Sequence, residues 1–125
     1  MKAGDAFHIN NEEFSGHLWF VVSDPDINDE EIVIANVTTW YPLKGNDCEL
    51  FEGDHPFIDK KSVIYYADAQ VLSIDDFRKY QKTGELVMYH TPASEELLVR
   101  IREGAARSKR LPFWPKGVLS DQGFI

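Results

Sequence analysis

The sequence predicts a small α+β domain, mainly β, with about five to six antiparallel strands followed by two helices. Short runs rich in Val, Ile and aromatic residues are separated by Gly, Pro, Asn and Asp at the spacing of a small barrel or sandwich. These runs come first and helical patterns follow, whereas a βαβ protein would alternate the two. The 125 residues indicate one domain (1–125) that can bury a core.

The predicted strands over residues 3–72 differ in how they are buried. The segment 4–10 alternates apolar and polar residues from Ala6 on, as expected of a strand with one buried face. The segment 17–23 (HLWFVVS) is continuously apolar, which is typical of a central strand buried on both faces. The expected strands are 4–10, 17–23, 32–37 with Thr38-Thr39 at its end, 48–51, 62–71 as the longest, and 85–90 as an edge strand.

A short helix is expected over 73–83. Ser73 can cap its start, and Asp76 three residues later can complete a capping box. Gly84 follows Thr83 and tolerates the left-handed conformation that ends many helices. This short helix would follow directly on the last strand of the predicted barrel.

A C-terminal helix and tail are expected over 91–125. Thr91 or Ser94 caps the helix, and four apolar residues at helical spacing predict a stripe that contacts the sheet: Leu97, Leu98, Ile101 and Ala105. The prolines of 111–115 stop the helix, so 116–125 is predicted to be a tail that frays. Phe113 and Trp114 either pack back on the domain or serve a partner.

Charge and composition limit the function classes. The net charge of −8 argues against broad, non-specific binding to nucleic acid. Residues 93–125 nevertheless carry six bases against four acids. These bases belong either to a solvated helix face and tail or to an anion-binding patch. They are Arg100, Arg102, Arg107, Lys109, Arg110 and Lys116.

Cysteine usage and hydropathy indicate the compartment. Cys48 is the only cysteine, so no internal disulfide forms and a reducing compartment is favoured. No leader-like apolar segment is present, and no apolar run approaches 18 residues. We therefore expect a cytoplasmic protein without membrane contact. Because the chain also lacks zinc-binding spacings and a Gly-rich phosphate loop, we expect no metal and no cofactor.

Histidines supply the candidate chemistry. His17 and His55 each lie where a loop meets a strand, and Pro56 keeps His55 on a stiff turn, Gly53-Asp-His-Pro56. Each is either a hydrogen-bonded structural residue or, if the two loops meet, half of an acid–base pair. Such a pair suits cleavage of RNA by attack of its own 2′-hydroxyl, which needs no metal.

Other polar residues complete this candidate site. Thr38 or Thr39 at a strand end can hydrogen-bond a phosphate oxygen, and Lys60 or Lys61 can stabilise developing negative charge. The expected substrate-binding residues supply further donors and stacking surface for unpaired bases. They are Ser62, Tyr65 and Trp40.

Four segments follow one another in a distinctive order. They are Gly4-Asp5, Leu18–Ser23 (LWFVVS), Ile32–Thr39 with its terminal threonine pair, and Ser62–Val71 followed by Ser73-Ile-Asp. This order resembles the MazF/PemK family of toxin endoribonucleases. Its second strand normally ends in Val-Val-Ser, and its next strand ends in a Thr/Ser pair. The likeness covers roughly residues 3–80.

The resemblance implies an SH3-like barrel, metal-independent cleavage of single-stranded RNA, a homodimer and neutralisation by an antitoxin protein. Thr38 or Thr39 maps to the family's catalytic Thr/Ser position. The family usually carries an Arg before its second strand, whereas Ser15-Gly16-His17 stands there in this chain, so His17 is the candidate to replace it. The alternative function is a non-catalytic SH3-like barrel that binds a protein partner.

Overall fold

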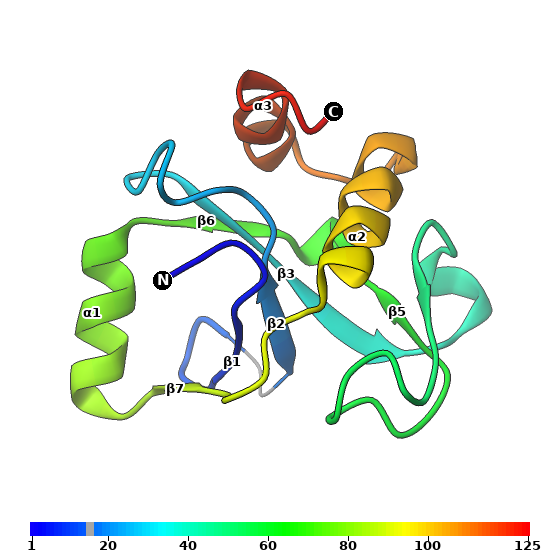
Figure 1. Ribbon diagram of the computed structural model, residues 1–125, viewed down its shortest axis with the longest axis horizontal. Helices are drawn as coiled ribbons and strands as arrows, with labels where there is room; N and C mark the ends of the chain where they lie inside the picture. Colours follow the sequence, from blue (N-terminus) through cyan, green and yellow to red (C-terminus); the bar gives the residue numbers. More distant parts are fainter. Residues whose placement is uncertain (15–16) are drawn as a thin grey trace.

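The structure is a computed structural model that describes residues 1–14 and 17–125. Its described part holds seven antiparallel strands and three α-helices (Figure 1). The strands are β1 (Ala6–Ile9), β2 (Leu18–Val21), β3 (Ile32–Thr39), β4 (Glu49–Leu50), β5 (Ser62–Ile64), β6 (Gln70–Leu72) and β7 (Leu86–Met88). The helices are α1 (Ile74–Thr83), α2 (Glu95–Arg107) and α3 (Phe113–Asp121). No described helix combines the length and hydrophobicity needed to cross a bilayer.

The predicted α+β class is confirmed, but the sheet does not close into a barrel within the described residues. Its strand order is β4-β5-β3-β2-β1-β7, with β6 also paired to β3. The central strand β3 is the longest, and it pairs with β2 along one edge and with β5 and β6 along the other. The terminal threonines of β3 are held along one edge, by pairing with Val63 and Ser62 of β5.

The predicted long strand over 62–71 is wrong, because it is interrupted by a turn. β5 and β6 both pair with β3, in the pairs Val37↔Ile64 and Ile34↔Gln70. Between these two pairs β3 advances by three residues, whereas the segment from β5 to β6 advances by six. The three extra residues are accommodated by the 3₁₀ turn η2 (Tyr66–Asp68). This insertion turns Tyr66 into the core, where only 3% of its surface is exposed.

The two faces of the sheet carry separate hydrophobic clusters. α1 covers the cluster around Phe77 and Trp19, whereas α2 and α3 cover the cluster around Phe20 and Leu119 (Figure 1). The predicted capping box of α1 is confirmed: Ser73 accepts from the Asp76 amide, and the Asp76 side chain accepts from the Ser73 amide. Ser94, rather than Thr91, caps α2. Three residues of the apolar stripe predicted for α2, Leu97, Ile101 and Ala105, are buried in the cluster around Phe20, whereas Leu98 is half-buried and belongs to neither cluster.

The C-terminal segment is helical, which corrects the prediction of a fraying tail. α3 begins after Pro112, and Pro115 lies in its first turn, where the missing amide hydrogen has no intrahelical partner to lose. The Trp114 indole donates to Glu31 at 2.5 Å, so α3 is tied to the β2–β3 turn. Phe113 is 92% exposed. Trp114 is itself 58% exposed and belongs to neither hydrophobic cluster, so the structure decides neither alternative for this pair.

The arginines of the C-terminal segment bind backbone carbonyl groups within the domain. Each guanidinium donates to a carbonyl oxygen at 2.5–2.8 Å: Arg100 to Glu49, Arg102 to Val22, Arg107 to Asp47 and Arg110 to Leu43. These contacts anchor α2 and the segment after it to the sheet and to the 41–50 loop. Four of the six bases that suggested an anion patch therefore serve as internal anchors.

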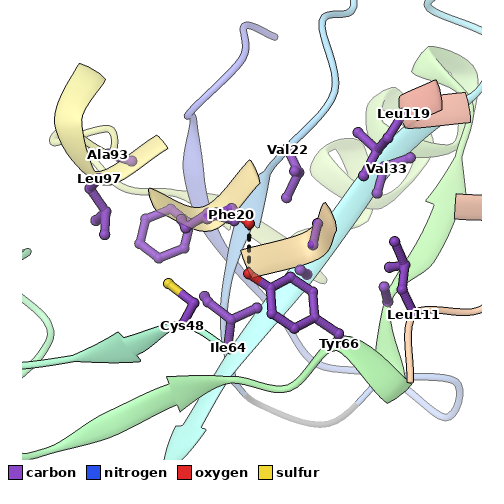
Figure 2. Packing of buried hydrophobic residues seen from close by; sticks show 14 of the residues in the cluster. Phe20, Val22, Val33, Cys48, Ile64, Tyr66, Ala93, Leu97, Leu111 and Leu119 are labelled. Atoms are coloured by element: carbon purple, nitrogen blue, oxygen red, sulfur yellow. Dashed lines mark hydrogen bonds between the residues drawn. The ribbon is translucent and has the colours of Figure 1, made fainter. Parts of the chain in front are cut away.

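α2 packs closely over Cys48 and Tyr66. Figure 2 shows both side chains pointing into the cluster beside Ile64, and the Tyr66 hydroxyl donates to the Ile101 carbonyl of α2 at 2.6 Å. Burial raises the pKa of the Cys48 thiol to about 11, so this sulfur is a neutral core group and a poor nucleophile. Gly104 supplies the close approach from the side of the helix.

Candidate functional site

A surface hollow of about 230 Å³ lies where the start of β2, the end of β3 and the segment before β5 meet. Its lining contains five of the residues predicted from the sequence: His17, Thr38, Thr39, Lys60 and Ser62. A second wall is formed by Phe57, Ile58 and Asp59. The hollow therefore gathers an imidazole, an ammonium group, a carboxylate and hydroxyl groups in one place.

Strand pairing explains why these side chains meet. Leu18 is opposite Val37, so His17 enters β2 beside the end of β3. Thr39 is opposite Ser62 across the β3–β5 ladder. Ser15 and Gly16, which stand in the place of the family's arginine, lie outside the described residues.

The pleat of β3 separates the two predicted threonines. Successive side chains of a strand point to opposite faces, so Thr39 shares the face of Val37 and Ser62, while Thr38 shares the face of Asn36. Val37 packs against the α2-side cluster, and Leu18, its partner, lines the hollow with it. Both threonines nevertheless line the hollow: Thr39 lies on the face of Ser62, and Thr38 stands at the register position opposite His17.

Lys60 is the cation of the hollow, and Lys61 is not. No ion pair engages Lys60 within residues 1–14 and 17–125. Lys61 Nζ lies 3.6 Å from Glu49 and 4.4 Å from the centre of the Trp40 ring, so its charge already interacts with these two side chains. The buried Ser62 hydroxyl donates to the Lys60 carbonyl at 2.9 Å, which fixes the backbone that carries the lysine.

Two of the predicted substrate-binding residues do not line the hollow. Trp40 is 37% exposed and holds Lys61 over its ring. Tyr65 is half-buried, and Lys44 Nζ lies 4.4 Å from its ring centre. Both rings are therefore already engaged with lysines of this chain.

His55 is structural, so the predicted His17–His55 acid–base pair does not form. His55 is only 3% exposed, and both ring nitrogens are occupied by backbone groups. Nε2 lies 2.7 Å from the Thr91 carbonyl oxygen, and Nδ1 accepts from the Phe57 amide at 3.2 Å. These contacts fit a neutral ring with its proton on Nε2. No lone pair or proton of this ring is left for a substrate.

The residue before His55 ties the same turn to α2. Arg100 donates to both carboxylate oxygens of Asp54, at 2.9 and 3.3 Å, and the Phe51 amide donates to Asp54 at 2.8 Å. Burial alone would raise the pKa of Asp54, but the hydrogen bonds from Arg100 and Phe51 outweigh it and lower the pKa. The turn that precedes the hollow is thus held at two successive residues.

We expect Asp54→Asn to lower the free energy of unfolding by about 1 kcal/mol at neutral pH, because a charge-assisted bidentate contact at a partly exposed position is lost. A carboxylate with a lowered folded-state pKa stabilises the protein above its unfolded-state pKa of about 3.9. This stabilisation is lost as the pH falls through the folded-state value. Urea unfolding near pH 7 and near pH 3 should show the difference between the two proteins shrinking.

The control for this prediction is Glu52→Gln, at an exposed position in the same turn. It should change stability by no more than about 0.5 kcal/mol at either pH. An Asp54→Asn defect of the same size at both pH values would contradict the role of the charge.

Sequence reasoning missed two residues of the second wall. Asp59 places a carboxylate in the hollow, and Phe57 places an exposed aromatic ring at its edge, with 57% of its surface accessible. Phe57 also stacks on Tyr89, with ring centres 4.0 Å apart. The sequence feature that could have identified them is their position between the stiff His-Pro turn and Lys60, just before the next strand.

Comparison with known proteins adds no assignment to this geometry. No protein-family model matches the chain, and no curated protein is significantly similar to it.

Proposed function

We propose that this protein is an endoribonuclease that cleaves single-stranded RNA at the hollow between β2, β3 and residues 57–62. One observation carries the proposal: His17, Asp59, Lys60 and Thr39 line the same hollow. Cleavage of RNA by its own 2′-hydroxyl needs a base, an acid and a cation that stabilises the phosphate charge. The side chains of this hollow offer one candidate for each role.

In the proposed step, the Asp59 carboxylate takes the proton of the ribose 2′-hydroxyl while that oxygen attacks the adjacent phosphorus. The bond from phosphorus to the 5′-oxygen breaks, and the His17 imidazolium gives its proton to the leaving oxygen. The products are a 2′,3′-cyclic phosphate and a free 5′-hydroxyl. Lys60 and the Thr39 hydroxyl stabilise the charge on the non-bridging phosphate oxygens.

The surroundings of the hollow favour a short unpaired segment as substrate. Phe57 offers an exposed ring for base stacking, which single-stranded binding commonly uses. The net charge of −8 weakens long-range attraction of the RNA backbone. Lys60 then provides attraction locally, at the phosphate to be cleaved.

The proposal extends to a cellular role. We place the protein as the toxin of a toxin–antitoxin pair, a homodimer neutralised by an antitoxin protein. This extension rests on the segment order Gly4-Asp5, Leu18–Ser23, Ile32–Thr39 and Ser62–Val71. Arrest of growth on induced expression is the outcome that the toxin role requires.

The test is a cleavage assay with purified protein, an end-labelled single-stranded RNA that contains all four bases, and EDTA. We expect cleavage, and mass spectrometry of the products should find 2′,3′-cyclic phosphate ends. A DNA strand of the same sequence should stay intact, because it lacks the attacking hydroxyl. Uncleaved RNA, or equal cleavage of the DNA, would contradict the proposed chemistry.

A second candidate is a protein-binding module. It is favoured by three exposed apolar side chains that follow Thr39 in the chain: Trp40, Tyr41 and Leu43, which are 37%, 54% and 71% exposed. Such a surface suits a partner protein more than a polar nucleic-acid backbone. RNA that stays intact in the cleavage assay leaves this module as the function.

A further inference from the structure

The second wall of the hollow follows one turn, and that turn is hydrogen-bonded to two other parts of the chain. Residues 57–60 supply Phe57, Ile58, Asp59 and Lys60 to the hollow. The turn before them is tied to α2 by Asp54 and to the segment before α2 by His55. Within the turn, the Ile58 amide donates to the His55 carbonyl at 2.9 Å.

His55 is the centre of these contacts. Its Nδ1 accepts from the Phe57 amide, and its Nε2 faces the carbonyl of Thr91. Its ring lies edge-on to Phe20 of β2, with centres 5.4 Å apart, and parallel to Phe57, with centres 6.0 Å apart. One imidazole therefore joins the sheet, the turn and the segment that leads into α2.

We propose that His55 is a positioning residue of the hollow: it holds Phe57, Asp59 and Lys60 at the distance from His17 and Thr39 that a substrate phosphate needs. The role in substrate positioning rests on the function proposed above, whereas the hold on the turn is a property of the fold. Misplacing a catalytic group by about 1 Å can cost about 100-fold in rate.

The hold on the turn depends on a neutral ring. A proton added at Nδ1 would face the Phe57 amide with a second donor, so that hydrogen bond would be lost. Asp54 and Arg100 hold the same turn through a separate contact.

Two conservative variants test the two ring nitrogens of His55 separately. The amide oxygen in His55→Asn reaches the place of Nδ1 and can still accept from Phe57. The amide nitrogen in His55→Gln reaches the place of Nε2 and can still donate to Thr91. His55→Ala removes both contacts, and His90→Ala, at an exposed position, is the control.

The experiment measures amide hydrogen exchange by NMR and RNA cleavage on the same samples. We expect exchange of the Phe57 amide to speed up at least tenfold in His55→Ala and in His55→Gln, but not in His55→Asn or His90→Ala. We expect cleavage to fall about 10- to 100-fold in His55→Ala, and His55→Asn should restore part of it.

The outcomes separate this proposal from the proposed function. Unchanged Phe57 exchange in both His55→Ala and His55→Gln overturns the hold on the turn. Faster exchange with full cleavage activity overturns the positioning role. A wild-type protein that leaves RNA intact overturns the proposed function and the substrate-positioning role together. In that case the exchange of the Phe57 amide still shows whether His55 holds the turn. If His55→Ala does not fold, the contrast between the Asn and Gln variants decides.

Discussion

Gly104→Ala should destabilise the protein by about 3 kcal/mol. A Cβ atom at this position would lie 2.8 Å from the Asp47 carbonyl oxygen, 2.9 Å from Cys48 Cβ and closer still to the Tyr66 hydroxyl. None of these neighbours can move freely. The Asp47 carbonyl accepts from Arg107, and the Tyr66 hydroxyl donates to Ile101.

The reason for the large effect is that the new methyl group pushes α2 away from the sheet. Alanine is the better helix former by about 1 kcal/mol, so the clash must exceed that gain to give the expected loss. Separation of α2 would also weaken the Arg100 contact to Asp54. Urea unfolding followed by circular dichroism measures the change in the free energy of unfolding.

Gly117→Ala is the matched control, because Gly117 also lies inside a helix, and a Cβ there meets no described atom within 4 Å. It should stabilise the protein by about 0.5–1 kcal/mol through helix propensity alone. A Gly104→Ala protein that unfolds at the same urea concentration as the wild type would show that the helix-to-sheet contact is looser than the structure has it.

Local patterns predicted most of the fold. The capping box at Ser73, the apolar strands around Trp19 and Ile34, and the stripe on α2 each depend on residues close in sequence. The long strand over 62–71 failed because its interruption depends on how β3 pairs, which local pattern does not show. Helix α3 departs from the predicted tail because prolines at the start of a helix are compatible with it, although prolines in a helix interior break it.

The residues of the candidate site that could be predicted from the sequence are those at or beside strand ends. Thr38, Thr39 and Ser62 lie at strand ends and His17 and Lys60 lie just before strands, and pairing brings these ends together. His55 was wrong because the sequence of a turn does not say whether a side chain points inward. Asp59 was missed because an Asp beside two lysines has the composition of an ordinary solvated turn.

Removal of either proposed proton-transfer group should abolish most of the cleavage. We expect His17→Ala and Asp59→Asn each to lower the cleavage rate by about 10²- to 10⁴-fold, the usual contribution of a positioned acid or base. Neither side chain is in the core, since Asp59 is exposed and His17 half-buried. Both proteins should therefore unfold at the wild-type urea concentration, and the loss can be assigned to the hollow.

The combined variant gives the stricter test. If the proton transfers by Asp59 and His17 belong to one concerted step, the double variant should be little slower than the worse single variant, because groups that act as a unit are not additive. The threonines supply a paired control from the pleat of β3. Thr39→Val, on the face of Ser62, should slow cleavage markedly, and its loss should exceed that of Thr38→Val, on the face of Asn36. Full activity in Thr39→Val, or in His17→Ala, would mean that the chemistry takes place outside this hollow.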